Sequence, residues 1–427
     1  MTITRAYFQN RIFSLRRKIE TLTSLPELVS LPTEQDIKQS QWFVIQSQLS
    51  SVSFRLSNDL HQVSENLSIA SDKESIRDLN VDITKIEMEL SKAYVFFDTF
   101  FDILSQRLSP KLGLLLSGCD VLAYDALKRI SPDFIPNNMP PLVFLDKGAG
   151  ASILREGVSV PGKAKNPLAT IQIPYEKLKQ KYLLVSILHE TGHQKMASLG
   201  LKKQVPLYMK KFMKKQKASE LLQGLFSNWT SELFPDFTSF WIIGAAQTIS
   251  TREILTFSPE MVLKVSPSDP HPPMWLRVQM SIDWCRRLWG FGPWDKWEKE
   301  WLELYPLYGS KYSPSEKIRN ILDESKNYIS KVTDFFFNMK FPELENQSIR
   351  SIYQKKPAHP ILLMSLVKNF KNFGKLDLRD LSPSEQLAVF VMLKYTENIS
   401  EKNLDILMTR WLVNLGQKNK KSLFRKI

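Results

Sequence analysis

The stretch His189-Glu190-Thr191-Gly192-His193 decides the fold of the region around it. Histidines at this spacing lie on one face of an α-helix, because the helix makes one turn in about 3.6 residues. Pro174 precedes the segment and Gly200 follows it, as expected for helix boundaries. Apolar residues continue the helical spacing on both sides, at Leu178, Tyr182, Val185, Leu188 and Met196. The sequence therefore predicts a helix that presents both imidazoles to one side.

Two imidazoles at this spacing, with a carboxylate beside the first, are typical of a catalytic zinc site. We expect His189 and His193 to bind the metal. Glu190 would take a proton from the water that the metal activates and pass it to the leaving amine. The alternative is that both histidines belong to an amphipathic helix that never binds metal.

A catalytic zinc needs a third protein ligand and one open position. Neither cysteine suits this role, because Cys119 lies well before the motif and Cys285 lies in an apolar run. Glu232 and Asp236 follow the second histidine and are four residues apart. We expect Glu232 to bind zinc and Asp236 to orient a ligating imidazole through its free ring nitrogen.

The order of three motifs, HExGH, ExxxD and HPPxxxR, resembles that of the gluzincin metallopeptidases. The last motif begins at His271 and ends at Arg277, and it is similar to a segment of the membrane-bound CaaX prenyl protease family and its soluble bacterial relatives. The segment from Trp229 to Arg277, through Gly244, also resembles a group of uncharacterised soluble bacterial metallopeptidases. The resemblance covers roughly residues 140 to 290, about a third of the chain, and its specificity rests on the three ordered motifs.

The resemblance implies a zinc ion bound by His189, His193 and Glu232, with Glu190 as the general base. It also implies that His271 donates to the oxyanion that forms on the scissile carbonyl. Arg277 would pair with a carboxylate of the site, such as Asp236, and fix the segment that carries His271. Alternatively, His271 is a turn residue of a proline-rich loop, and Arg277 is an ordinary charge on a helix surface.

Pro235 departs from the pattern of these relatives, which usually have a small helix-compatible residue between the two carboxylates. Proline inside a helix removes a backbone donor and costs about 3 kcal/mol. We therefore expect Glu232 and Asp236 either on two successive helices or on one kinked helix. The orienting role of Asp236 depends on this geometry more than the ligand role of Glu232 does.

Residues 170–174 alternate apolar and polar side chains and end in a proline, which is typical of an edge strand. An exposed edge beside the zinc would bind an extended peptide as one more strand, with Ile171 and Ile173 at the substrate. The alternative is that the strand only packs under the helix. Residues 141–146 and 152–155 would be its neighbours, joined by a turn at Gly148-Ala149-Gly150. The sequence thus predicts an α+β fold, mostly helical, with a zincin-like core that contains a small sheet.

The chain has 427 residues, enough for two or three domains, and its patterns divide it into three regions. Residues 1–135 are predicted to be helical, with a long antiparallel hairpin that turns near residues 71–75. Residues 136–310 would hold the metallopeptidase core. Residues 311–427 would form a helical domain that ends in a basic, disordered tail from Lys418. We expect the hairpin to be a scaffold or a docking arm, with a cover over the zinc as the alternative.

Basic residues outnumber acidic ones by 58 to 44, which gives a net charge of +14. This charge would steer acidic substrates, or bring the chain to nucleic acid or an anionic membrane surface, unless the basic stretch is only a solvated face. Much of the excess directly follows the predicted zinc helix, at Lys202, Lys203, Lys210, Lys211, Lys214, Lys215 and Lys217.

The sequence shows no apolar run of about 18 or more residues and no apolar segment of a signal peptide near Met1. The 2 cysteines are too few for a disulfide framework. We therefore expect a soluble cytoplasmic protein without a transmembrane segment.

Together these patterns predict a soluble zinc-dependent metalloendopeptidase, a hydrolase that cuts peptide bonds with Glu190 as the general base. The alternative is a binding or regulatory protein that holds zinc without catalysis and associates with nucleic acid or anionic surfaces through its lysines. The motifs do not specify the substrate, because specificity depends on the shape of the pocket.

Overall fold

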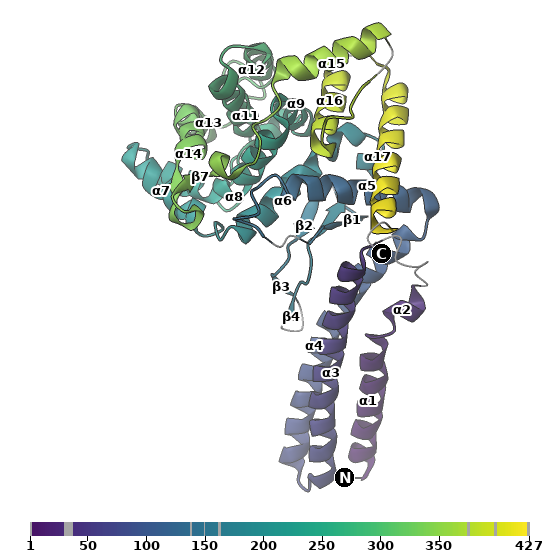
Figure 1. Ribbon diagram of the computed structural model, residues 1–427. Coiled ribbons are helices and arrows are strands. Elements are labelled where there is room, and N and C mark those ends of the chain that lie inside the picture. The colour runs from purple at the N-terminus through teal and green to yellow at the C-terminus, as the bar shows by residue number, and fades with distance from the viewer. Residues whose placement is uncertain are drawn as a thin grey trace.

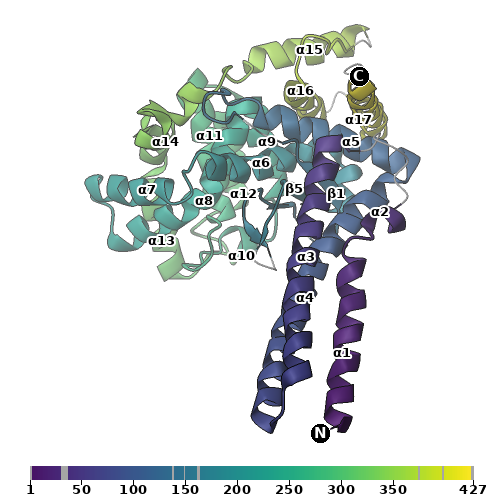
Figure 2. The ribbon, with the colours of Figure 1, turned by 60° about the horizontal axis from the view of Figure 1, so that its bottom comes forward.

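The structure is a computed structural model, which describes residues 2–29, 37–136, 139–148, 150–160, 164–373, 376–396 and 399–424. These residues are mostly helical and form three small sheets, so the predicted α+β class is confirmed. A long helical arm projects from a wider body, as Figures 1 and 2 show. None of the described helices combines the length and the apolar character that crossing a membrane requires.

Three long helices form the arm. They are α1 (Thr2–Thr21), α3 (Gln39–Ile69) and α4 (Lys73–Arg107), and the one-turn α2 (Leu25–Leu28) follows α1. Helices α3 and α4 form the predicted antiparallel hairpin. Its turn contains Asp72, which caps α4 by accepting hydrogen bonds from the backbone N–H groups of Glu74 and Ser75. The apolar faces of the arm form a core separate from the core of the body.

The largest sheet has three strands in the order β1-β5-β2. They are β1 (Leu142–Leu145), β5 (Thr170–Ile173) and β2 (Ser152–Leu154). Strand β5 pairs in parallel with β1 and antiparallel with β2, so it is the central strand and the predicted edge position is wrong. Two further pairs are β3 (Ser159–Val160) with β4 (Ala164–Lys165), and β6 (Lys340–Phe341) with β7 (Gln347–Ser348). Ala149, in the predicted turn, lies outside the described residues.

Because β5 is paired on both sides, it has no edge to offer a peptide. Ile171 and Ile173 are each 0 % exposed and belong to the core of the body. The prediction that these two residues bind substrate is therefore wrong. On the other face of the strand Thr170 is also buried and Gln172 is half-buried, so the alternation does not mark a strand with one face fully in solvent.

One apolar core runs through the body from Leu115 to Leu415. The helices beyond residue 311 share this core with the predicted metallopeptidase region. Helix α5 (Pro110–Leu127), which the sequence placed in the N-terminal region, shares it too.

The body also contains the helices α6 (Val185–Ser198), α7 (Gln204–Lys215), α8 (Glu220–Ile243), α9 (Ala245–Ile254) and α11 (Met274–Trp289). The remaining ones are α10 (Pro259–Val262), α12 (Pro293–Leu304), α13 (Glu316–Lys326), α14 (Ile329–Asn338), α15 (Pro360–Phe373), α16 (Pro383–Tyr395) and α17 (Glu401–Phe424).

Helices α5 and α17 approach each other closely at two glycines. A Cβ atom at Gly118 would lie 2.3 Å from the backbone oxygen of Leu412, and one at Gly416 would lie 2.3 Å from the backbone oxygen of Leu114. Helix α17 continues to Phe424, so the predicted disorder from Lys418 onward is wrong up to that residue. Residues 425–427 lie outside the described residues.

The predicted zinc helix is α6, and it begins at Val185. Two short 3-10 helices precede it, at Tyr175–Leu178 and Lys181–Leu184. The apolar spacing predicted Leu178 and Tyr182 as part of the same helix. In the structure they lie in these two 3-10 helices instead.

Candidate metal centre

Helices α6 and α8 cross at the motif residues. A Cβ atom at Gly192 would lie 2.5 Å from Cα of Pro235 and 2.6 Å from Oγ1 of Thr238, so this approach requires glycine in the HExGH motif. Helix α8 runs unbroken through Pro235. Of the two predicted arrangements, two successive helices is therefore wrong, because Glu232 and Asp236 lie one turn apart on the same helix.

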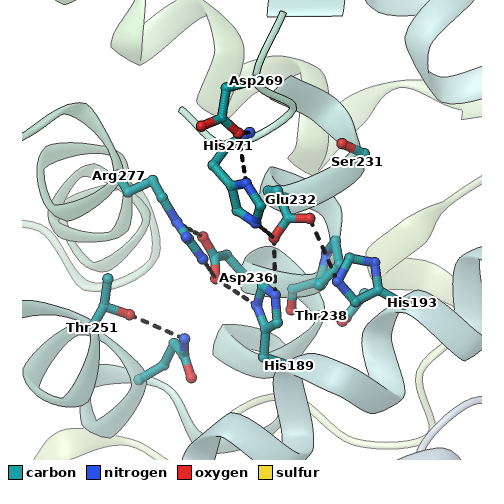
Figure 3. A network of polar contacts seen from close by, with 12 residues as sticks. His189, His193, Ser231, Glu232, Asp236, Thr238, Thr251, Asp269, His271 and Arg277 are labelled. Atoms are coloured by element: carbon teal, nitrogen blue, oxygen red, sulfur yellow. Dashed lines mark hydrogen bonds and ion pairs between the residues drawn. The ribbon is translucent and has the colours of Figure 1, made fainter. Parts of the chain in front are cut away.

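The crossing brings Glu232 to both imidazoles, as Figure 3 shows. Its Oε2 lies 3.2 Å from Nε2 of His189, and its Oε1 lies 3.6 Å from Nε2 of His193. The ring centroids of the two histidines are 5.1 Å apart. Ligand atoms of His189, Glu190 and His193 also lie within 4.8 Å of one another.

These distances fit a single metal ion. Atoms about 2.0–2.2 Å from a tetrahedral zinc lie about 3.3–3.5 Å from one another, and imidazoles bound through Nε2 have centroids about 5 Å apart. Glu232 fits the third ligand position better than Glu190, because both of its oxygens face the rings at this spacing. Two imidazoles and one carboxylate also suit iron(II), so the donor set indicates a divalent metal without selecting zinc.

Asp236 connects His189 to Arg277 of α11. Its Oδ1 accepts a hydrogen bond of 2.8 Å from Nδ1 of His189. Arg277 donates to both carboxylate oxygens, from Nε and Nη2, and each distance is 2.8 Å. The structure therefore contains the predicted contact between Arg277 and Asp236. A proton on Nδ1 leaves Nε2 of His189 free as a ligand and holds the ring in position.

The charges around the imidazoles differ. Burial opposes protonation of His189, but the carboxylates of Asp236 and Glu232 outweigh it and raise the pKa of His189 to about 10. Burial and the neighbouring His189 lower the pKa of His193 to about 4. Burial of Glu232 is outweighed by its hydrogen bond to His189, which lowers the pKa of Glu232 to about 2. A metal thus has to displace one proton, from His189, because His193 is already neutral.

Glu190 is 6 % exposed and lines the same cavity as the two histidines. Burial raises the pKa of its carboxyl group, although the charge of His189 opposes the shift. A raised pKa suits a carboxylate that accepts a proton in one step and donates it in a later one.

His271 lies on the loop before α11, at the rim of the site, with 57 % of its side chain exposed. Its Nε2 is 3.7 Å from Oε2 of Glu232. Its Nδ1 and its backbone N–H group both lie within hydrogen-bond distance of Oδ1 of Asp269. Asp269 is not among the predicted site residues. The only local signal for it is its position two residues before His271, which is typical of a side chain that caps a turn.

A cavity of about 610 Å³ lies over these residues. The segment that contains β2 lines part of it, and α9 contributes Gln247, Thr251 and Ile254. The α9 residues belong to no motif, so they could not be predicted from the sequence. In the described part of the chain no residue of α1 to α4 lines the cavity, so the arm does not cover it.

Among the described strands, β2, not β5, has a free edge beside His189, Glu190 and His193. One edge of β2 pairs with β5, and no other described strand pairs with its second edge. Ser152 and Ile153 of β2 line the cavity. They occupy the place beside the motif that the sequence assigned to Ile171 and Ile173.

The predicted basic stretch forms the loop before α7 and the exposed face of that helix. Helix α7 buries Val205, Met209 and Met213. All seven lysines between Lys202 and Lys217 are exposed. Lys202 also lines the cavity of the metal-type residues.

Comparisons with protein families, with curated proteins and with solved structures found no match to this chain. The resemblance to the gluzincin metallopeptidases therefore depends on the three motifs and stays a prediction.

Proposed function

We propose that the protein is a zinc-dependent metalloendopeptidase. The observation that carries the proposal is the convergence of His189, His193 and Glu232 at the spacing of one coordination sphere. A zinc ion held by these side chains would supply Lewis acidity and an activated water.

The chain's own groups divide the remaining work. Glu190 takes a proton from the attacking water and gives it to the leaving amine. Asp236 and Arg277 hold the ring of His189 so that its Nε2 points at the ligand position. His271, held by Asp269, donates a hydrogen bond to the negative charge that develops on the scissile carbonyl.

The substrate is an extended peptide that lies along the unpaired edge of β2. An edge strand offers backbone N–H and C=O groups to any sequence, so its hydrogen bonds give affinity without selecting side chains. A cytoplasmic location belongs to the same proposal, because both cysteines are buried and unpaired, which suits a reducing compartment.

The test combines metal analysis with cleavage of an unfolded protein such as casein. We expect wild type and Glu190→Gln to hold equal amounts of zinc, and only wild type to cleave, because the substitution removes the base and keeps the ligands. His189→Ala should lose zinc. His61→Ala is the matched control, since His61 lies on the arm with 71 % of its side chain exposed and should change neither measurement.

Equal zinc in His189→Ala and wild type would contradict the proposed centre. Zinc in wild type and in Glu190→Gln, with cleavage of no protein or peptide by wild type, would favour the alternative of a non-catalytic zinc protein.

A second proposal concerns an anionic partner, nucleic acid or a membrane surface, at the exposed lysines from Lys202 to Lys217. Such binding weakens steeply as salt rises, because counterions are released when the lysines meet phosphates. Binding of RNA or of anionic vesicles that does not change with salt would contradict it.

A further inference from the structure

A second cavity lies next to the cavity that contains His189, Glu190 and His193. The second cavity has a volume of about 550 Å³ and is lined by the start of the segment after β2 and by residues of α6 such as Gln194 and Ser198. Two residues line both cavities, and they are Arg155 and Lys202. Both are cations, so positive charge is placed at the junction between the two spaces.

Strand β2 leads directly to this junction. Gly150, Ala151, Ser152 and Ile153 line the first cavity, and Arg155 follows at the end of the strand. A peptide that lies along the unpaired edge of β2 therefore reaches Arg155 at the border between the first cavity and the second. One extended residue spans about 3.3 Å, so a few residues are enough to cover this path.

Neither cation at the junction is neutralised. Within the described residues, no carboxylate lies within ion-pair distance of Arg155 or Lys202, in contrast to Arg277, which is paired with Asp236. The second cavity contains one carboxylate, Glu156, but this residue does not line the first cavity. The junction itself thus holds two cations and no anion.

We propose that Arg155 and Lys202 form a subsite for a carboxylate of a peptide substrate. The inference rests on the proposed peptidase function. Arg155 presents a planar fork of donors that matches a carboxylate, and Lys202 adds a second positive charge. The remaining exposed lysines up to Lys217 extend this positive surface outward along α7 and raise the local concentration of acidic chains.

The carboxylate has two possible sources, an Asp or Glu side chain or the C-terminus of the peptide. The experiment separates them with fluorescein-labelled peptide libraries of about ten residues, long enough to cross both cavities at about 3.3 Å per residue. The libraries are identical except for Glu, Gln or Lys at one fixed position. Each is made with a free and with an amidated C-terminus.

Binding is measured by fluorescence anisotropy with the zinc-loaded Glu190→Gln protein, so that the readout does not require turnover. We expect the Glu library to bind about fivefold more tightly than the Gln library, the scale of a solvent-exposed ion pair, and the difference to shrink as salt rises. Arg155→Glu with Lys202→Glu should reverse the preference toward the Lys library. Arg17→Glu with Lys18→Glu is the matched control, because both residues are exposed on α1 of the arm and line neither cavity.

A preference that depends on a free C-terminus, with Glu and Gln equal, assigns the subsite to the terminal carboxylate. A preference for Glu that survives amidation assigns it to a side chain. Equal binding of all libraries, no binding at all, or a Glu preference that persists in the double variant would overturn the inference. Arg155→Gln with Lys202→Gln, which removes the charges without reversing them, repeats the test if the reversed variant does not fold.

The outcome is separable from that of the proposed function. Wild-type protein that cleaves the libraries without regard to charge keeps the peptidase and removes the subsite. Glu190→Gln protein that prefers Glu, together with wild type that cleaves nothing, keeps the subsite and removes the peptidase.

Discussion

Asp236→Asn tests the link between metal binding and the second layer of contacts. The substitution keeps the shape of the side chain and removes its charge. Asp236 accepts three hydrogen bonds of 2.8 Å, one from His189 and two from Arg277. An Asn side chain has one acceptor oxygen and an NH₂ group, so at least one of these contacts becomes a donor facing a donor.

Two magnitudes follow from this geometry. Loss of a carboxylate that orients a ligating imidazole typically reduces metal affinity 10- to 100-fold, so we expect a reduction of about that size. The side chains of Asp236 and Arg277 are 5 % and 13 % exposed. Removing one partner of such a buried pair leaves the other charge uncompensated, so the unfolding free energy should fall by about 3 kcal/mol. The pKa of His189 should also fall, because burial opposes its protonation and Asp236 is the strongest influence that raises it.

Zinc affinity is measured by competition with a chromogenic chelator, and stability by urea denaturation of the metal-free protein. Asp269→Asn is the control, because Asp269 contacts His271 at the exposed rim, with 44 % of its side chain exposed. It should leave zinc affinity unchanged and stability within about 0.5 kcal/mol. The reasoning is refuted if Asp236→Asn binds zinc as tightly as wild type, or if Asp269→Asn weakens zinc binding as much as Asp236→Asn does.

Two further predictions concern α6 itself. Gly192→Ala places a Cβ atom 2.5 Å from Cα of Pro235, so α6 and α8 must separate and zinc affinity should fall. Gly224→Ala on α8 is the control, because its Cβ atom meets no atom within 4 Å. This variant should gain about 1 kcal/mol of stability. Equal calorimetric melting shifts in the two variants would contradict the close crossing. Lys195 is fully buried, and burial lowers its pKa from 10.5 to about 7. The unfolded chain therefore binds the extra proton between these values, and the unfolding free energy of wild type should rise with pH by about 1.4 kcal/mol per unit. Lys195→Met should be more stable at pH 7 and lack this rise, and parallel pH profiles of the two proteins would exclude a neutral Lys195.

The motif residues were predictable because their contacts are set by local spacing. Residues four apart on a helix share a face, so His189 and His193 had to lie together once the segment was helical. The same spacing placed Glu232 and Asp236 one turn apart. What the spacing did not show is that α8 continues through Pro235 and that Gly192 packs against the backbone of this proline. Neither residue reveals its partner in the sequence.

The order of strands was not predictable from the same kind of pattern. Thr170 to Ile173 alternate as a half-buried edge strand does, yet β5 lies between two strands whose residues are 16 or more positions away. Pairing over such distances depends on which segments the helices bring together, and a local alternation contains no record of it. The predicted disorder at the charged end of α17 was wrong for a similar reason. The helix packs against α5 at Gly416, and this contact is distant in the sequence.

A charge count explains why the site needs more than its protein groups. Glu190, Glu232 and Asp236 are each less than a tenth exposed, and Arg277 is the only arginine or lysine in ion-pair distance of them in the described chain. With both imidazoles neutral, the cluster carries two uncompensated negative charges, which is costly in a buried position. A proton on His189 cancels one of them, in agreement with the raised pKa of that ring. A divalent cation at the ligand positions cancels both and replaces that proton, so the same carboxylates that favour protonation of His189 also favour the metal that competes with it.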